Sequence, residues 1–282
     1  MLSLFFYFIL FLFGTSIGSF LNTLIYRSFT KKSLLGRSFC THCKRTLEAK
    51  DLIPLLSFIL LKGKCRYCKK PISWQYPLVE FTSGVILPST IYFLFHFSQL
   101  SPQIRDIFFK DIFSQIEFLL FLLLLLLILF SFVIFFVSDI KYMALPEIPL
   151  FVSLFCAFFY QIIGARLFPQ IFDFKKTLAL TLGVASFFAF LVFLTRERAM
   201  GKGDIYLASL VSLFLGKEMG VFAVYFSFVL GTIFSLFLIL AKKKTFKSKI
   251  PFGPFLIISG LLFFFFENFL TWLFFKLLNY FI

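Results

Sequence analysis

Four cysteines stand in two pairs whose spacing is typical of a metal site. The pairs are separated by 21 residues and each reads Cys-x-x-Cys: Cys40, Cys43, Cys65 and Cys68. Two such hairpins can enclose one zinc ion with four thiolates, which leaves no open position for a catalytic water. Basic residues beside both pairs favour the thiolate form. We therefore predict a structural zinc site, with His42 as a neighbour and a labile pair of dithiols as the alternative.

Two acidic residues at the ends of apolar runs are the second candidate for chemistry. Asp139 directly follows the run 117–137, and Asp204 ends the sequence Gly201-Lys202-Gly203-Asp204. Two carboxylates in one site do not both ionise easily, so one can act as a base toward water while the other protonates an amide. That is the chemistry of an aspartic protease. The two glycines would let the backbone approach a substrate strand closely.

Each acid also has an ordinary structural explanation. Asp139 could be a solvated helix end beside Lys141, and Asp204 could cap the helix that follows it. Glu147 and Asp173 lie at a similar depth relative to the apolar runs, so they are equally eligible as members of the pair. Residue types and spacing alone therefore leave the choice of the pair open.

The composition says what kind of scaffold must position these groups. Apolar residues make up 60% of the 282 residues and charged residues only 15%, and the mean hydropathy is +0.98. A soluble domain has about 45–50% apolar and about 25% charged residues. The chain is therefore expected in a bilayer, which excludes a secreted disulfide scaffold, a disordered chain and an ordinary cytosolic enzyme. The chain has five cysteines, an odd number, and four of them form the two Cys-x-x-Cys pairs, which indicates a reducing compartment rather than disulfides. The fifth, Cys156, is expected to pack as a small apolar residue.

Apolar runs of about 20 residues predict membrane-spanning helices. Eight candidates follow one another, the sixth of them short: 2–26, 77–97, 117–137, 149–167, 177–195, 204–216, 219–241 and 254–278. We predict an all-α polytopic membrane protein with about eight spans, within a range of six to eight. Its parts are a first transmembrane helix (1–26), a small zinc-binding cytoplasmic insert (27–76, the cysteine insert) and a transmembrane peptidase bundle (77–282).

The distribution of basic residues predicts the orientation. Under the eight-span topology, 21 Lys and Arg residues fall on the side of the cysteine insert and seven on the other. Cytoplasmic loops carry the excess of basic residues, so the insert is expected in the cytoplasm. The net charge of +15 reflects this asymmetry, and no nucleic-acid partner is expected. The surrounding partner is the lipid bilayer, and the oligomeric state is left open.

Six short motifs in order resemble the type IV prepilin peptidases, membrane aspartic proteases with a Gly-x-Gly-Asp motif. They begin with Gly18 to Arg27 and continue through the two cysteine pairs, with Ile53 to Ser57 between the pairs and Ile72 to Glu80 after them. The later motifs are Gly201 to Asp204 and Pro251 to Phe255. The resemblance covers nearly the whole chain. One departure is Glu147 after Leu145-Pro146, where the family usually has Asp.

The resemblance implies a function and assigns its residues. It implies Asp139 and Asp204 as the catalytic pair, with Gly201 and Gly203 as active-site backbone. Such enzymes cut the basic leader of prepilins or pseudopilins after a Gly on the cytoplasmic side of the bacterial inner membrane. Members with a four-cysteine insert typically also methylate the new N-terminal residue with S-adenosylmethionine, so a bifunctional enzyme is expected.

The sequence does not itself show a site for the methyl donor. Asn22, Arg27 and Glu80 are polar residues near the cysteine insert and are the candidates for cofactor binding, with helix termination and snorkelling as the alternative. The alternatives for the whole chain are a peptidase without methyltransferase activity and a proton-coupled transporter that uses the two aspartates. A third alternative is a zinc-dependent membrane assembly factor without catalysis, but this would not explain the presence of Gly201 and Gly203.

Overall fold

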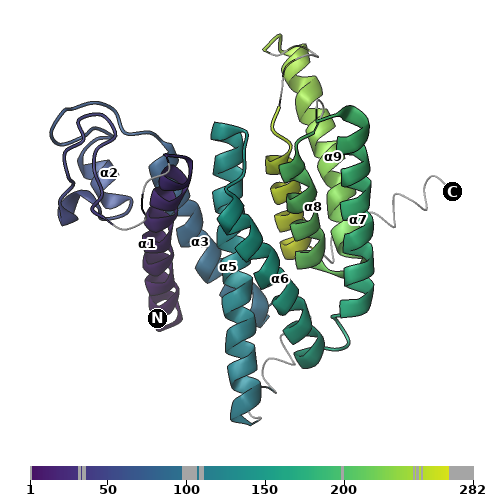
Figure 1. The fold of residues 1–282 in the computed structure, drawn as a ribbon. Helices are drawn as coiled ribbons and strands as arrows, with labels where there is room; N and C mark the ends of the chain where they lie inside the picture. Colours follow the sequence, from purple (N-terminus) through teal and green to yellow (C-terminus); the bar gives the residue numbers. More distant parts are fainter. Residues whose placement is uncertain are drawn as a thin grey trace. The chain divides into compact units, whose positions relative to one another are not determined.

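A computed structural model describes residues 2–30, 33, 36–96, 107, 111–197, 200–243, 245, 248 and 250–266. Within these residues the regular structure is helical, apart from two isolated bridges that pair Phe39 with Thr46 and Lys64 with Pro71. The chain divides into two compact units, residues 1–102 and 103–282, and each is described by itself (Figure 1). The predicted all-α class is confirmed.

The first unit is built on two helices that pack along each other, α1 (Leu2–Thr30) and α3 (Gln75–His96). Glycines allow their close approach. A Cβ atom added at Gly14 would lie 2.5 Å from the carbonyl oxygen of Ser83, and one added at Gly18 would lie 2.7 Å from Cα of Glu80. Glycines four residues apart bring apolar helices into backbone contact. This contact holds together the two ends between which the cysteine insert lies.

The cysteine insert contains little regular structure of its own. The 3₁₀ turn η1 (Ala49–Asp51) and the short helix α2 (Leu56–Leu60) separate two hairpin turns, each of which carries one cysteine pair. Each hairpin is closed by one of the isolated bridges. A segment of this size buries too little apolar surface to be stable alone, so links other than an apolar core must contribute to its order.

The second unit is a helical bundle. Its helices are α5 (Ile112–Tyr142), α6 (Glu147–Leu167), α7 (Phe174–Thr195), α8 (Lys202–Leu215), α9 (Lys217–Leu240) and Gly253–Phe266. Helix α8 packs against α6, α7 and α9, and its residues Leu207, Ala208, Leu210 and Val211 are fully buried (Figure 1). Short connections make successive helices antiparallel. The end of α5, the start of α6 and the start of α8 therefore lie at the same end of this unit.

Within the described part of the chain, six helices are long and apolar enough to cross a membrane, namely α1, α3, α5, α6, α7 and α9. They correspond to six of the eight predicted runs. The short run 204–216 forms α8, whose 14 residues span about 21 Å, less than the hydrocarbon thickness of about 30 Å. The last run, 254–278, is helical from Gly253 to Phe266, and its remainder lies outside the described residues. The chain is a multi-pass membrane protein with at least six candidate spans; the division at residues 26 and 76 stays a prediction.

Candidate active site and metal centre

The four paired cysteines converge within the cysteine insert. Their Sγ atoms all lie within 4.8 Å of one another, and those of Cys40 and Cys68 are 3.9 Å apart. Four sulfurs bound at about 2.3 Å to one tetrahedral zinc ion are about 3.8 Å apart, so the cluster has the dimensions of a metal site. His42 is exposed and does not belong to the group, and Cys156 is buried in α6.

The two hairpins hold their cysteines in the same way. In the first, the N–H of Cys40 donates to the Arg45 carbonyl and the N–H of Lys44 donates to the Cys40 carbonyl, both at 2.9 Å; the second repeats both bonds with Cys65, Lys69 and Lys70. Lys44 and Lys69 both adopt left-handed backbone conformations, with φ 61° and 59°. Burial raises the pKa of the Cys65 thiol, but backbone N–H groups and the neighbouring thiols outweigh burial and lower the pKa to about 7. The second hairpin thus favours the thiolate at Cys65, whereas burial raises the pKa of the Cys40 thiol in the first hairpin to about 11.

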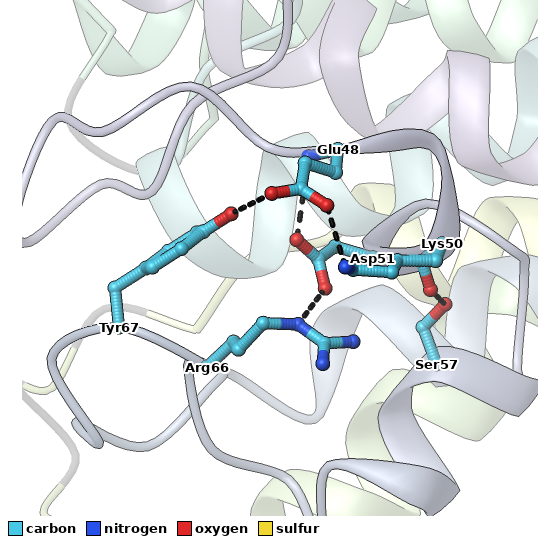
Figure 2. Close-up of polar contacts among 6 residues, drawn as sticks. All are labelled: Glu48, Lys50, Asp51, Ser57, Arg66 and Tyr67. Atoms are coloured by element: carbon cyan, nitrogen blue, oxygen red, sulfur yellow. Dashed lines mark hydrogen bonds and ion pairs between the residues drawn. The ribbon is translucent and has the colours of Figure 1, made fainter.

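A polar network joins η1, α2 and the second hairpin. Figure 2 shows its six members: Glu48, Lys50, Asp51, Ser57, Arg66 and Tyr67. The Nε–H of Arg66 donates to Asp51 at 2.6 Å, and the hydroxyl of Tyr67 donates to Glu48 at 3.0 Å. On the other side, the hydroxyl of Ser57 in α2 donates to the carbonyl oxygen of Lys50 at 3.0 Å. The network therefore ties the second cysteine pair to the rest of the insert.

Asp139 lies in the last turn of α5, in the second unit. Only 8% of its surface is exposed, and its Oδ2 atom accepts a hydrogen bond of 2.9 Å from the N–H of Gly253. The helix ends just beyond it, where Met143 adopts a left-handed conformation and its N–H donates to the Asp139 carbonyl. Asp139 is thus a buried helix-end carboxylate, and the expected alternative of a solvated helix end is wrong.

Gly253 is a site residue that sequence reasoning placed in a motif but not in the site. A Cβ atom at this position would lie 2.6 Å from Oδ2 of Asp139 and 3.0 Å from Leu207 of α8. A side chain would therefore displace the carboxylate that the Gly253 N–H holds. The sequence feature that could have indicated this position is Pro251-Phe252-Gly253-Pro254, a glycine between two prolines at the start of a helix.

Asp204 lies in the first turn of α8. The N-cap of this helix is Gly201, and Oδ2 of Asp204 accepts a hydrogen bond of 3.1 Å from the N–H of Gly201. Asp204 therefore does not occupy the capping position itself, although its carboxylate does close the first turn. It is partly buried, and Leu207, one turn further along α8, lies beside Gly253. The second unit thus brings the two predicted acids to the same end, near Gly253.

Two other acids were equally eligible by sequence, and the structure separates them from this pair. Asp173 is the N-cap of α7 and accepts a hydrogen bond from the N–H of Lys176. It lies beyond the far end of α6, whose 21 residues span about 31 Å. Glu147 begins α6 at the same end as Asp139 but is exposed.

The glycines before Asp204 are not required by the fold itself. Gly201 has an ordinary φ of −85°, and among the described residues a Cβ atom there would meet only Oδ2 of Asp204, at 4.0 Å. At Gly203 the Cβ would lie 3.3 Å from the flexible side chain of Leu145. Among the described residues, space is therefore open beside Gly201, whereas Leu145 already lies close to Gly203.

The three candidates for the methyl donor make contacts inside the first unit. Asn22 donates to the Tyr76 carbonyl at 3.1 Å, and Arg27 donates to backbone carbonyls at the start of the cysteine insert, with 2.8 Å to that of Ser33. Glu80 accepts a hydrogen bond of 2.8 Å from the N–H of Leu55. All three residues are buried. They link α1, the insert and α3 as buried residues inside the helices, which differs from the expected alternative of helix termination and snorkelling, and a role toward the methyl donor stays a prediction.

Comparison with known proteins identifies the family of two long regions of the chain. Residues 12–95 match the bacterial peptidase A24 N-terminal domain, and residues 122–236 match the type IV leader peptidase family. No solved structure shows significant similarity to the chain.

Curated relatives match over most of their length. A prepilin leader peptidase/N-methyltransferase of Bacillus subtilis is 30% identical over 87% of this chain and 88% of its own. The protein of the same name from Vibrio cholerae is 31% identical, and the alignment covers 88% of this chain and 92% of that protein. The one from Aeromonas hydrophila is 27% identical, over 89% of this chain and 88% of that protein. The predicted resemblance is confirmed, and the chain belongs to the type IV leader peptidase family.

Proposed function

We propose that the chain is an intramembrane aspartic endopeptidase that cleaves the basic leader of type IV prepilins or pseudopilins after a Gly. The observation that carries the proposal is the placement of Asp139 and Asp204 at one end of a membrane-embedded bundle, where Gly253 lies against both Asp139 and Leu207 of α8. Family membership supplies the substrate class, since the relatives are named prepilin leader peptidases.

The proposed reaction divides the work between the two carboxylates. The ionised one removes a proton from water, and the water oxygen attacks the carbonyl carbon of the scissile peptide bond. The protonated one then gives its proton to the amide nitrogen as the C–N bond breaks. The hydrogen bond from Gly253 holds Asp139 in place. The open space beside Gly201 would admit the substrate backbone.

The proposed function makes a direct test of the pair possible. We expect Asp139→Asn or Asp204→Asn to abolish leader cleavage while the protein stays folded, because neither amide can act as base or acid. Asp173→Asn is the matched control: it lies at the other end of α6, and Asn also caps helices well. The assay is cleavage of a purified prepilin read by mass spectrometry. Wild-type rates in either active-site variant would refute the dyad.

We further propose that the enzyme methylates the new N-terminus with S-adenosylmethionine, as the names of the relatives suggest. The same mass-spectrometric assay, with and without the methyl donor, distinguishes this from a peptidase alone. A mature N-terminus heavier by one methyl group only when the donor is present supports the second activity. Cleavage with no such increase would leave a peptidase alone.

Zinc is the metal that we propose for the four-sulfur cluster. When bound, it would cross-link the two hairpins of the cysteine insert through Cys40, Cys43, Cys65 and Cys68. We expect Cys40→Ser to lower the bound zinc measured by elemental analysis, and Cys156→Ser, the matched control outside the cluster, to leave it unchanged. Equal zinc content in the two variants would contradict the site.

The proposed location is the bacterial inner membrane, with the cysteine insert and both aspartates on the cytoplasmic side. The excess of basic residues on the side of the insert supports this orientation. A membrane-impermeant amine reagent should label the insert lysines in inverted vesicles but not in intact spheroplasts.

A further inference from the structure

One face of α2 is apolar and exposed. Leu56, Ile59 and Leu60 follow the helical spacing that places them together, and Ile59 and Leu60 expose 67% and 76% of their surface. The buried Ser57 lies on another face and is bonded to the carbonyl oxygen of Lys50. The apolar face thus points away from the body of the insert.

The side of α2 opposite to this face contacts the residue that precedes a membrane-spanning helix, which places α2 at the start of that helix. The ring of Phe58 in α2 packs against that of Trp74, with 5.1 Å between the centroids, and Trp74 immediately precedes α3. Trp74 is 70% exposed. Spacings of four, three and four residues put it in line with the exposed Leu78, Phe81 and Val85 of α3. In a spanning helix such an exposed apolar stripe faces lipid, and a Trp at its end marks the membrane–water interface.

The position of α2 relative to α3 is fixed by backbone contacts. Pro54, Leu55 and Leu56 form a γ-turn, with φ 61° and ψ −50° at Leu55 and a hydrogen bond of 2.6 Å from the N–H of Leu56 to the Pro54 carbonyl. The carboxylate of Glu80 in α3 accepts the N–H of Leu55. The exposed face of α2 is therefore held beside the end of α3 rather than carried on a free loop.

Charge complements the apolar face. The insert has twelve Lys and Arg residues against two acids, Glu48 and Asp51. The lysines that follow α2 are exposed: Lys62, Lys64, Lys69 and Lys70. Basic residues beside an apolar surface are typical of segments that lie on anionic lipid.

We propose that the α2 apolar surface, comprising Leu52, Ile53, Leu56, Ile59, Leu60 and Trp74, inserts into the interfacial region of the adjacent membrane leaflet. The occupant of this surface is lipid, with anionic headgroups against the lysines. The metal cluster would then be held at the membrane surface rather than extend into solution.

Tryptophan fluorescence in the full-length protein can measure this depth. The chain has two tryptophans, so Trp272→Phe leaves Trp74 as the sole probe of the α3 end. A second protein carries Leu60→Trp with Trp74→Phe and Trp272→Phe, and probes α2 itself. Both proteins are reconstituted in vesicles of phosphatidylcholine with or without phosphatidylglycerol. Their tryptophan fluorescence is then quenched in three ways: by lipids with a nitroxide near the headgroup, by lipids with a nitroxide at the chain end, or by acrylamide in the water.

For a surface that enters about 5–10 Å, shallow nitroxides should quench both probes about twofold more than deep ones, and acrylamide should quench them weakly. For the probe at position 60, phosphatidylglycerol should increase the lipid quenching. Adding Ile59→Glu to that protein should release the probe to acrylamide, and the matched Ile59→Met should not. Strong acrylamide quenching of the parent probe would place α2 in water, and protection from every quencher would mean that protein covers it. Either result overturns the proposal.

Discussion

The contact between Gly253 and Asp139 shows how one residue without a side chain can set the position of a carboxylate that we propose to be catalytic. The two residues are 114 positions apart, and the N–H of one holds Oδ2 of the other at 2.9 Å. A backbone donor has a fixed direction, so it orients the carboxylate more firmly than a flexible side chain would. Space for this bond exists only because no Cβ is present.

Gly253→Ala should therefore lower the cleavage rate with little effect on folding. The added methyl group would have to move Oδ2 of Asp139, which lies 2.6 Å away, and a shift near 1 Å in a catalytic group can cost about a hundredfold in rate. The measurement is kcat for a prepilin substrate. Gly183→Ala, where a Cβ meets nothing within 4 Å among the described residues, is the control. Equal rates in both variants would show that Gly253 does not position Asp139.

Asp51 is the residue of the cysteine insert whose charge should matter most. Burial raises its pKa, but the hydrogen bond from Arg66 and the N–H of Glu48 outweigh this and hold the pKa below its usual value. A lowered pKa in the folded state means that the charged form stabilises the insert above the unfolded pKa. That stabilisation is lost as the pH falls through the folded pKa.

We expect Asp51→Asn to increase hydrogen exchange in residues 48–67 a few-fold, since partly exposed ion pairs contribute modestly. The difference from wild type should be constant from about pH 8 down to about pH 5 and should shrink only below about pH 4, the range of an ordinary carboxyl group. Exchange followed by mass spectrometry, with metal in excess, gives the comparison. A difference that already fades near neutral pH would contradict the lowered pKa.

At the scale of elements, α8 is positioned from its C-terminal end. The amide of Gln161 in α6 donates to the carbonyls of Leu213 and Phe214, and the hydroxyl of Thr177 in α7 accepts the N–H of Lys217. Between these bonds stands Gly216, with φ 72° and ψ 172°, a conformation open almost only to glycine. The turn from α8 to α9 therefore determines where Asp204, one helix length away, is placed.

Gly216→Ala should destabilise the bundle by about 1–3 kcal/mol through backbone strain alone. Its Cβ would also lie 2.9 Å from Nε2 of Gln161. Gly183→Ala, in the middle of α7, should be neutral or stabilising by up to about 1 kcal/mol, because alanine is the better helix former. Thermal unfolding midpoints in detergent provide the test, and a Gly216 variant as stable as the Gly183 variant would argue against the strain.

The helices were predictable because a long apolar run has few alternatives in a membrane. Their ends were not, since polar residues extend them: α5 runs from Ile112 to Tyr142, whereas the apolar run alone predicts 117–137. Its start follows Asp111 as N-cap, and its end depends on the left-handed Met143. Such ends are set by local backbone geometry that hydropathy does not report.

For the whole molecule, the two centres differ in how far sequence could define them. The cysteine cluster follows from a short repeated motif within one insert, so its members were predictable from spacing. The acids and Gly253 come from three segments far apart in the chain, and residue types left Glu147 and Asp173 as eligible as Asp139. Only the folded bundle, together with family membership, distinguishes them.

The duplicate construction of the cysteine hairpins bears on how an ion is captured. Each loop is closed by its own backbone bonds and its own left-handed lysine, so each fixes its two cysteines independently of the other loop. Binding of the proposed ion would then require that two preformed pairs of ligands meet, rather than that four separate ligands be ordered at once. The entropic cost of binding would fall mainly on the segment that joins the two loops.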